Sequence, residues 1–515
     1  MTGVARRLAL GWLAMLVLAA FGVVGAERAR AAQYTVSACG AAAGFQNNLL
    51  TASVSDGRMS AYTACPNDGS GHFVGVAAIA GVSQGSVPVF ANSIQSFLAP
   101  AGTTIRHLHV KAEGRAWNGD WASLLQASND RFGSSFWNLS GCSGNAGSAN
   151  GCVSALVNLV QNYDLNGATG VRALVSCGSF SGCTTVSTGS WPFTRAYYFL
   201  HEFDVALEDD SSPVVGSPGG ALASQQWLHG SHTLTFDARD NSGIRRTRFW
   251  VDDLGTINDD VRDCNYTYAV PCSNVPNGEY SLDTSRLTDG IHHIAADGLD
   301  ATDTNVGSVA QTIFVDNHAP AEPGAPFVVE GEGWHTTNDF TVRWTNPPSA
   351  APIERASYEI CAGGGGGPCT TGTQASRGVD HLSNLQVAGP GDYTVRVWLA
   401  DGAGNVSDAK SAPLHLKFDN VPPAQAQPQH RNGWVNEADA KRVDQEIDPN
   451  GNPPVSGIAG YAVTTDGSSP GEIVTVPANG DNGYVGHADL VDLPEGTTTV
   501  RARAISGAGI SSHEV

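Results

Sequence analysis

The stretch Asp392-Tyr393-Thr394-Val395-Arg396-Val397-Trp398-Leu399, followed by the turn Asp401-Gly402-Ala403-Gly404-Asn405, decides the fold of this chain. Apolar and polar residues alternate along it, which predicts a strand with one buried and one solvated face. Gly and Asn then favour a tight turn. The segments His232–Ala238 and Thr497–Ala504 alternate in the same way. With 61 Gly, 26 Pro and no helix-rich stretch, the sequence predicts an all-β protein.

Sequence landmarks recur about every hundred residues, a spacing typical of tandem domains. Each unit begins near a tryptophan, namely Trp227, Trp334 and Trp434. The first two units end in similar motifs, Phe314-Val315-Asp316-Asn317 and Lys417-Phe418-Asp419-Asn420. We therefore predict three repeats, at residues 208–319, 320–423 and 424–515. The third repeat is expected to lack its closing strand, because no such C-terminal motif follows its last alternating segment. Repetition of this kind supplies reach more often than chemistry.

The alternating strand and Asp-x-Ala-Gly-Asn turn, together with Ser242-Gly243-Ile244 and Ser456-Gly457-Ile458, resemble the tandem immunoglobulin-like, or fibronectin type III-like, repeats of bacterial secreted and surface proteins. The resemblance implies β-sandwich repeats that serve spacing, adhesion or display. Residues 32–207 precede the repeats and are similar to the jelly-roll domains often found in that position. They are predicted to form one jelly-roll or β-sandwich domain.

The first residues predict export. Arg6 and Arg7 precede an apolar run over residues 8–24, and Ala29-Arg30-Ala31 matches a signal-peptidase site. We predict a signal peptide at residues 1–31, cleavage near Ala31, and a mature protein that is secreted or held at the cell surface without inserting into a membrane. An uncleaved membrane anchor is the alternative.

The ten cysteines fit an oxidising compartment, because they fall in neighbouring pairs that predict local disulfides. The expected pairs are Cys39 with Cys65, Cys142 with Cys152, Cys177 with Cys183, Cys264 with Cys272, and Cys361 with Cys369. A net charge of −21 and a pI near 5.0 argue against a nucleic-acid partner.

Candidate ligand-binding residues lie in residues 32–207. Trp117 and Trp121 flank a turn that contains Asp120, and Trp137 lies nearby in sequence. Flat aromatic rings with neighbouring carboxylates can hold sugars, so a polysaccharide or cell-wall glycan is the candidate partner. The alternative is that these rings fill the core, as large aromatics commonly do. The oligomeric state is not indicated.

No catalytic residue is predicted, because the sequence holds none of the common nucleophile, zinc-protease or phosphate-loop motifs. The favoured function is a non-catalytic binding or adhesion protein. Two alternatives stay open. One is an exported carbohydrate-active enzyme of the glycoside hydrolase type, with Glu202 and Asp204 as its carboxylates. The other is a purely structural envelope or matrix protein. His107 and His109 share one strand face and could bind a metal, but no third ligand is evident.

Calcium is the one cofactor that the sequence suggests. Its candidate ligands are acidic residues near the ends of the repeats, namely Asp297, Asp300, Asp316 and Asp419. Calcium needs six to eight oxygens, more than each turn offers. The favoured alternative is that these side chains accept hydrogen bonds from nearby backbone N–H groups within their turns.

Overall fold

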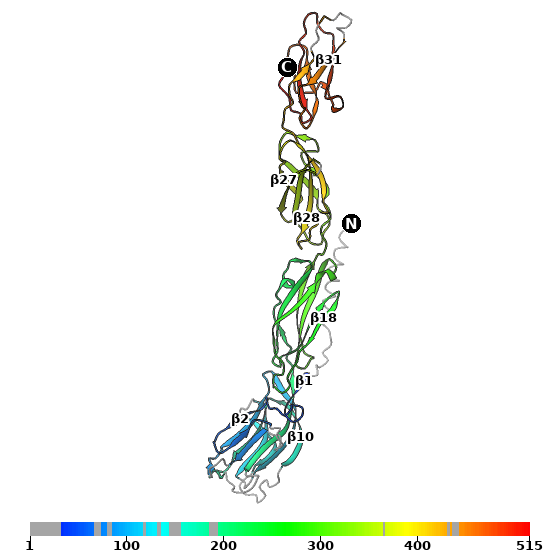
Figure 1. Cartoon of the computed structure of the whole chain (residues 1–515). Coiled ribbons are helices and arrows are strands. Elements are labelled where there is room, and N and C mark those ends of the chain that lie inside the picture. Colours follow the sequence, from blue (N-terminus) through cyan, green and yellow to red (C-terminus); the bar gives the residue numbers. More distant parts are fainter. Residues whose placement is uncertain are drawn as a thin grey trace, which may run out of the picture. The chain divides into compact units, whose positions relative to one another are not determined.

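The computed structural model describes residues 32–65, 74–79, 85–116, 120–130, 135–143, 156–184, 194–363, 366–429, 433–434 and 442–515. Within these ranges the regular elements are β-strands and short 3-10 helices, which confirms the predicted all-β class. Figure 1 follows them along the chain. No helix in these ranges has the length and apolar character needed to cross a bilayer. The predicted signal peptide lies outside the described residues.

The N-terminal domain contains two main sheets. The first has the order β10-β7-β13-β4-β3, with β1 also paired to β13. Its strands are β1 (Ala32–Cys39), β3 (Ser60–Tyr62), β4 (Val74–Ile79), β7 (Thr103–Ala116), β10 (Leu156–Ala168) and β13 (Thr194–Asp209). The second has the order β2-β6-β11-β8-β9. Its strands are β2 (Thr51–Val54), β6 (Asn92–Leu98), β8 (Trp121–Ser128), β9 (Phe136–Ser143) and β11 (Gly170–Cys177). A small ribbon pairs β5 (Ser86–Val87) with β12 (Cys183–Thr184).

Alternation of side chains packs these two sheets face to face. Phe97 of β6 and Phe203 of β13 are both fully buried, and their ring centroids lie 5.9 Å apart across the interior. Leu108 and Val110 of β7 are also fully buried, whereas the intervening residues face outward. The domain is therefore a two-layer sandwich. The finer jelly-roll assignment stays a prediction.

The first repeat is a second sandwich. One sheet has the order β14-β16-β19 and the other β15-β21-β20-β17-β18. The strands are β14 (Val214–Val215), β15 (Trp227–Leu228), β16 (Ser231–Arg239), β17 (Ile244–Val251), β18 (Gly255–Val261), β19 (Val275–Asp283), β20 (Gly290–Asp300) and β21 (Val306–Val315), with 3-10 helices η1 (Ala221–Ala223) and η2 (Thr284–Arg286). The Tyr280 ring lies 5.3 Å from that of Phe236 and 5.2 Å from that of Phe249, so aromatic stacking joins the two layers.

The second repeat has the same strand order, β22-β24-β27 and β23-β29-β28-β25-β26. In both repeats the short second strand pairs parallel with the last strand, as β15 does with β21 and β23 with β29. The strands are β22 (Gly324–Val328), β23 (Trp334–His335), β24 (Phe340–Thr345), β25 (Ile353–Ala362), β26 (Cys369–Ala375), β27 (His381–Leu385), β28 (Gly391–Asp401) and β29 (Ala412–Phe418). This shared order identifies both repeats as immunoglobulin-like or fibronectin type III-like sandwiches.

The third repeat keeps the first three-stranded sheet, β30-β31-β34, beside a sheet of order β33-β32-β35. The strands are β30 (Ala426–Pro428), β31 (Arg442–Pro449), β32 (Ile458–Thr464), β33 (Val476–Pro477), β34 (Gly486–Val491) and β35 (Arg501–Ser506), with the 3-10 helix η4 (Gly480–Asn482). Beyond β35, the N–H groups of Ser512 and Val515 donate to the carbonyl oxygens of Ala504 and Ala502. These residues occupy the edge that β21 and β29 occupy in the other repeats.

Four predicted disulfides are confirmed. They are Cys39–Cys65, Cys177–Cys183, Cys264–Cys272 and Cys361–Cys369. The fifth predicted pair lies outside the description, since Cys152 and the side chain of Cys142 are not described. Cys361 and Cys369 face each other on adjacent strands, so their bond closes the β25–β26 hairpin.

The N-terminal domain and most of the first repeat form one compact unit, which contains residues 208–223, 233–281 and 293–312 of that repeat. One hydrophobic core runs through both parts, because Cys272 and Ala301 belong to the same buried cluster as Val36 and Leu207. The second compact unit holds the remainder of the chain.

Candidate functional site

The outward face of β7 carries the polar side chains that the sequence singled out. His107 and His109 point to the same face, as alternation predicts. His107 Nδ1 lies 2.6 Å from Asp164 Oδ1, and His109 Nδ1 lies 2.8 Å from Asn162 Oδ1, both on β10. The Nδ1 atom of each imidazole is therefore engaged by the neighbouring strand β10. The two His side chains form part of a polar cross-strand lattice.

Glu202 and Asp204 of β13 lie on the same outward face, on either side of the buried Phe203. The Glu202 carboxylate lies 3.6 Å from Lys111 Nζ and 3.8 Å from His109 Nε2. Asp204 is in register with His109. These half-exposed ion pairs are typical of a solvated sheet face. A hydrolytic role for the two carboxylates stays a prediction.

The structure exposes only some of the candidate sugar-binding residues. Trp117 lies outside the described residues. Trp121 is 2% exposed and belongs to the core cluster, so its ring presents no open face to a ligand. Asp120 is half-buried in the turn before it. Trp137 of β9 is 39% exposed and keeps an open ring. Of the described candidates, Trp137 is the one that could stack on a sugar.

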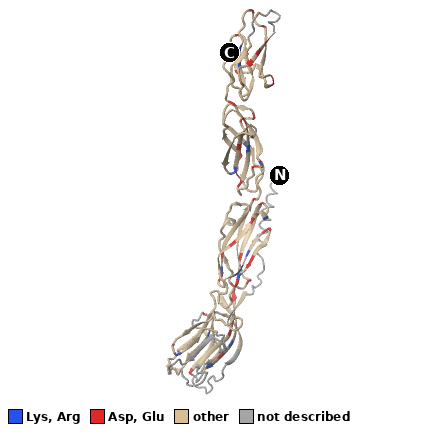
Figure 2. Ribbon diagram, viewed as in Figure 1, with Lys and Arg blue, Asp and Glu red and all other residues tan. Residues whose placement is uncertain are grey.

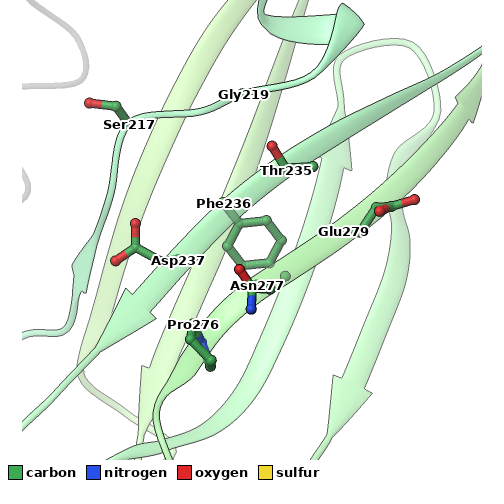
Figure 3. A pocket seen from close by; sticks show the side chains of 9 residues that line it. Ser217, Gly219, Thr235, Phe236, Asp237, Pro276, Asn277 and Glu279 are labelled. Carbon is green, nitrogen blue, oxygen red and sulfur yellow. The ribbon is translucent and has the colours of Figure 1, made fainter.

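Sequence reasoning missed a pocket of about 480 Å³ on the first repeat. Figure 3 shows it over β16 and β19, with Asp237 and Glu279 on its borders and the Phe236 ring between the strands. Asp237 Oδ2 lies 3.1 Å from Arg239 Nε. A Cβ added at Gly278 would lie 2.5 Å from the Phe236 ring, so this glycine lets the ring pack against the β19 backbone.

The candidate calcium ligands are not gathered into one site. Asp297 pairs with Arg248 at 3.2 Å and accepts a hydrogen bond from Ser308 Oγ at 2.6 Å. Asp300, Asp316 and Asp419 are each buried at a different domain end. Figure 2 shows Asp and Glu on all four domains, with Lys and Arg interspersed among them.

A buried aspartate lies at the end of the closing strand, or directly after it, at each of the three domain junctions. Asp209, Asp316 and Asp419 are 0%, 1% and 0% exposed. In each, Oδ1 accepts the backbone N–H of the residue two positions later. These three side chains therefore hold equivalent positions.

At the second and third junctions, the other carboxylate oxygen is bonded by the next repeat. Asp316 Oδ2 accepts the Ala351 N–H at 2.8 Å, and Asp419 Oδ2 accepts the Ser456 N–H at 2.9 Å. In addition, Asn405 Nδ2 donates to the Asp316 carbonyl oxygen at 2.7 Å. A single aspartate thus ends one sandwich and orients the first turn of the next.

At the first junction, three carboxylates converge. Asp209 ends β13, Asp300 ends β20, and Asp240 lies in the turn between β16 and β17. One carboxylate oxygen from each lies within 4.8 Å of the other two. Burial raises the pKa of Asp240 and of Asp300, and the nearby Asp209 carboxylate raises both further. Burial, followed by these same three carboxylates, also raises the pKa of the adjacent Tyr34 phenol.

The Cys264–Cys272 loop of the first repeat contacts the N-terminal domain at this junction. The Ser37 N–H of β1 donates to the Tyr266 carbonyl oxygen at 2.9 Å, and the Tyr34 hydroxyl donates to the Ala269 carbonyl oxygen at 3.1 Å. The Tyr266 ring packs against the N-terminal core, 6.5 Å from that of Tyr34. This disulfide therefore closes a loop that also forms a docking surface for the N-terminal domain.

No protein-family model matches the chain, and no curated protein matches it either. Among solved structures, the fibronectin(III)-like modules of Clostridium thermocellum CbhA align at 10% identity, over 39% of this chain and 92% of that chain, with a TM-score of 0.22. The FN1-FN3 domains of chicken CNTN1 align at 9% identity, over 65% of this chain and 97% of that chain, with a TM-score of 0.25. Likenesses this weak carry no argument about activity, and a bacterial source stays a prediction.

Proposed function

We propose that this chain is a secreted or cell-surface protein without catalytic activity, whose sandwich repeats form a stalk that presents the N-terminal domain. The observation that carries this proposal is the aspartate repeated at every domain junction. Asp209 ends its closing strand, Asp316 and Asp419 come directly after theirs, and all three are buried. Such direct bonding between successive domains suits a spacer, in which the order and distance of the domains are the function.

The N-terminal domain is the part that such a stalk would present. Its exposed Trp137 ring and the polar lattice on β7, β10 and β13 are open surfaces of the kind that bind extended polymers. We propose a polysaccharide or cell-wall glycan as the ligand. A flat aromatic ring stacks on the C–H face of a sugar, and polar side chains bond sugar hydroxyls, so each surface offers one of these two kinds of contact.

Small-angle scattering of residues 32–515 tests the stalk. A compact globule of this length would have a radius of gyration of about 23 Å. Strands β20 and β28 have 11 residues each, which gives about 36 Å per domain at ~3.3 Å per residue. Four such domains end to end predict a radius of gyration of roughly 40 Å. A value near that of the globule would refute the stalk.

Retention on immobilised polysaccharides and cell-wall fractions tests the binding role. We expect Trp137→Ala to weaken retention about tenfold or more. Trp250→Ala is the matched control, because Trp250 is 38% exposed on the first repeat, compared with 39% for Trp137. Equal loss in both variants would contradict a site at Trp137. Release of soluble sugar by the unmodified protein would contradict the non-catalytic assignment.

A further inference from the structure

The first domain junction contains buried oxygens without hydrogen-bond partners. Asp209 is fully buried, and its Oδ1 accepts from the Ser211 N–H at 3.0 Å and from Asn241 Nδ2 at 3.3 Å. Its Oδ2 is buried and has no partner in the described part of the chain, and the same is true of Asn241 Oδ1. Native proteins rarely leave such atoms unpaired, because each loses its bonds to water without replacement.

The other two junctions show which donor is missing. The N–H groups of Ala351 and Ser456, each two residues before the first residue of β25 or β32, fill the corresponding position. Ser242 stands in the same place before β17, but its N–H donates to Asp240 Oδ1 at 2.9 Å. Asp240 therefore removes the donor that Asp209 would receive and adds a second negative charge beside it.

The third charge comes from Asp300, which ends β20 as Asp401 ends β28. The corresponding position at the third junction is Ser506, the last residue of β35. None of the ion pairs that the structure shows among its described residues involves Asp209, Asp240 or Asp300. Within the described residues, the first junction thus concentrates three carboxylates that form no ion pair with a cationic side chain.

We propose that Asp209, Asp240 and Asp300, together with Asn241 Oδ1, bind a calcium ion. Calcium takes carboxylate and amide oxygens at 2.3–2.6 Å, so two oxygens on one ion lie at most about 5 Å apart. The 4.8 Å spacing of the three carboxylates meets that limit. The ion supplies the partner that Asp209 Oδ2 lacks and neutralises the cluster, and water completes its coordination shell. The inference goes beyond the stalk function, because it adds a ligand to one particular junction.

The test uses the mature chain, residues 32–515, freed of metal with EDTA. Terbium binds calcium sites and emits when nearby Tyr rings are excited, and Tyr34 and Tyr266 lie at this junction. We expect terbium emission that calcium displaces. We also expect millimolar calcium to raise the melting temperature of one calorimetric transition by about 3–5 °C, given a submillimolar Kd.

Asp240→Asn is the diagnostic variant, because the amide oxygen can still accept the Ser242 N–H while one ligand charge is lost. We expect it to abolish the emission and the calcium shift. Asp466→Asn is the matched control, since Asp466 accepts from the N–H and hydroxyl of Ser468 in the same geometry on the third repeat. It should keep both responses.

Three outcomes would overturn the proposal. The first is an unchanged calcium response in Asp240→Asn. The second is a mature chain whose melting and emission are indifferent to calcium. The third is an equal melting shift with magnesium at the same concentration, which would refute calcium as the occupant.

Discussion

Replacing Tyr266 with Ala should loosen the docking of the first repeat on the N-terminal domain. Tyr266 is half-buried against the N-terminal core, and its hydroxyl donates to the Ala301 carbonyl oxygen at 2.9 Å. Truncating a fully buried large aromatic costs about 3–5 kcal/mol, so half burial costs about 2 kcal/mol. The lost hydrogen bond adds about 1 kcal/mol. The free energy that opposes opening of this interface should therefore fall by about 3 kcal/mol, a factor of roughly 150.

Hydrogen exchange measured by mass spectrometry on peptides from β1 reports this opening, because the Ser37 N–H donates to the Tyr266 carbonyl oxygen. We expect the Ser37 amide to exchange about 150-fold faster in Tyr266→Ala, and about fivefold faster in Tyr266→Phe, which loses only the hydroxyl bond. The β1 amides bonded to β13 should change little.

Tyr268→Ala is the matched control, since Tyr268 lies in the same disulfide loop and is 48% exposed. It should leave the Ser37 amide unchanged. Equal acceleration in the two Ala variants, or none in Tyr266→Ala, would refute the conclusion that the Tyr266 ring holds the interface.

Three further predictions concern individual residues of the repeats. Asn405→Ala removes the hydrogen-bond donor to the Asp316 carbonyl oxygen and to Asp401 Oδ2. Calorimetry should therefore show the second repeat destabilised by roughly 2–4 kcal/mol. The control Asn420→Ala, at an exposed position, should have little effect. Gly278→Ala places a Cβ 2.5 Å from the Phe236 ring and should destabilise the first repeat by about 1–3 kcal/mol. The control Gly333→Ala should leave stability unchanged, because no atom lies within 4 Å of the added Cβ. Carbon-13 titration should place the Asp401 pKa above 3.8 because of burial and the Asp466 pKa below it because Ser468 donates to that carboxylate. The contribution of Asp401 to the free energy of unfolding therefore increases as the pH falls through its folded-state pKa. The contribution of Asp466 is instead lost as the pH falls through its own folded-state pKa. The reverse order of the two pKa values would contradict both assignments.

Period-two alternation was enough to predict the sandwiches, because strands with one buried face must alternate. The same rule could have settled Trp121. It is in phase with Leu125 and Ala127, which are fully buried, so the ring belongs to the core. Sequence reasoning treated it instead as a residue of an exposed turn. Neighbouring cysteines were equally informative, since short loops leave few other partners.

The junction chemistry was harder to predict because it joins residues distant in sequence. Asp297 and Asp401 each stand between an alanine and a glycine, which favours them as equivalent residues. The structure instead makes Asp300 the equivalent of Asp401, because each is paired with the first residue of the neighbouring strand. Asp209 and Asp240 were not predicted as site residues, because neither belongs to a repeated sequence motif. Only the folded chain brings them beside Asp300. The docking role of Tyr266 was missed for a similar reason, because an irregular loop has no period that marks its buried side.

The parallel pairing of β15 with β21 and of β23 with β29 determines how these repeats respond to pulling. Tension applied at the two ends of a repeat draws the early strand toward its own N-terminus and the last strand toward its own C-terminus. The paired strands must then slide past each other, so the hydrogen bonds between them are loaded together in shear. Antiparallel neighbours at a hairpin would separate one bond at a time. A tether anchored at one end and bound to a ligand at the other would therefore resist extension at the strands where the chain enters and leaves each sandwich.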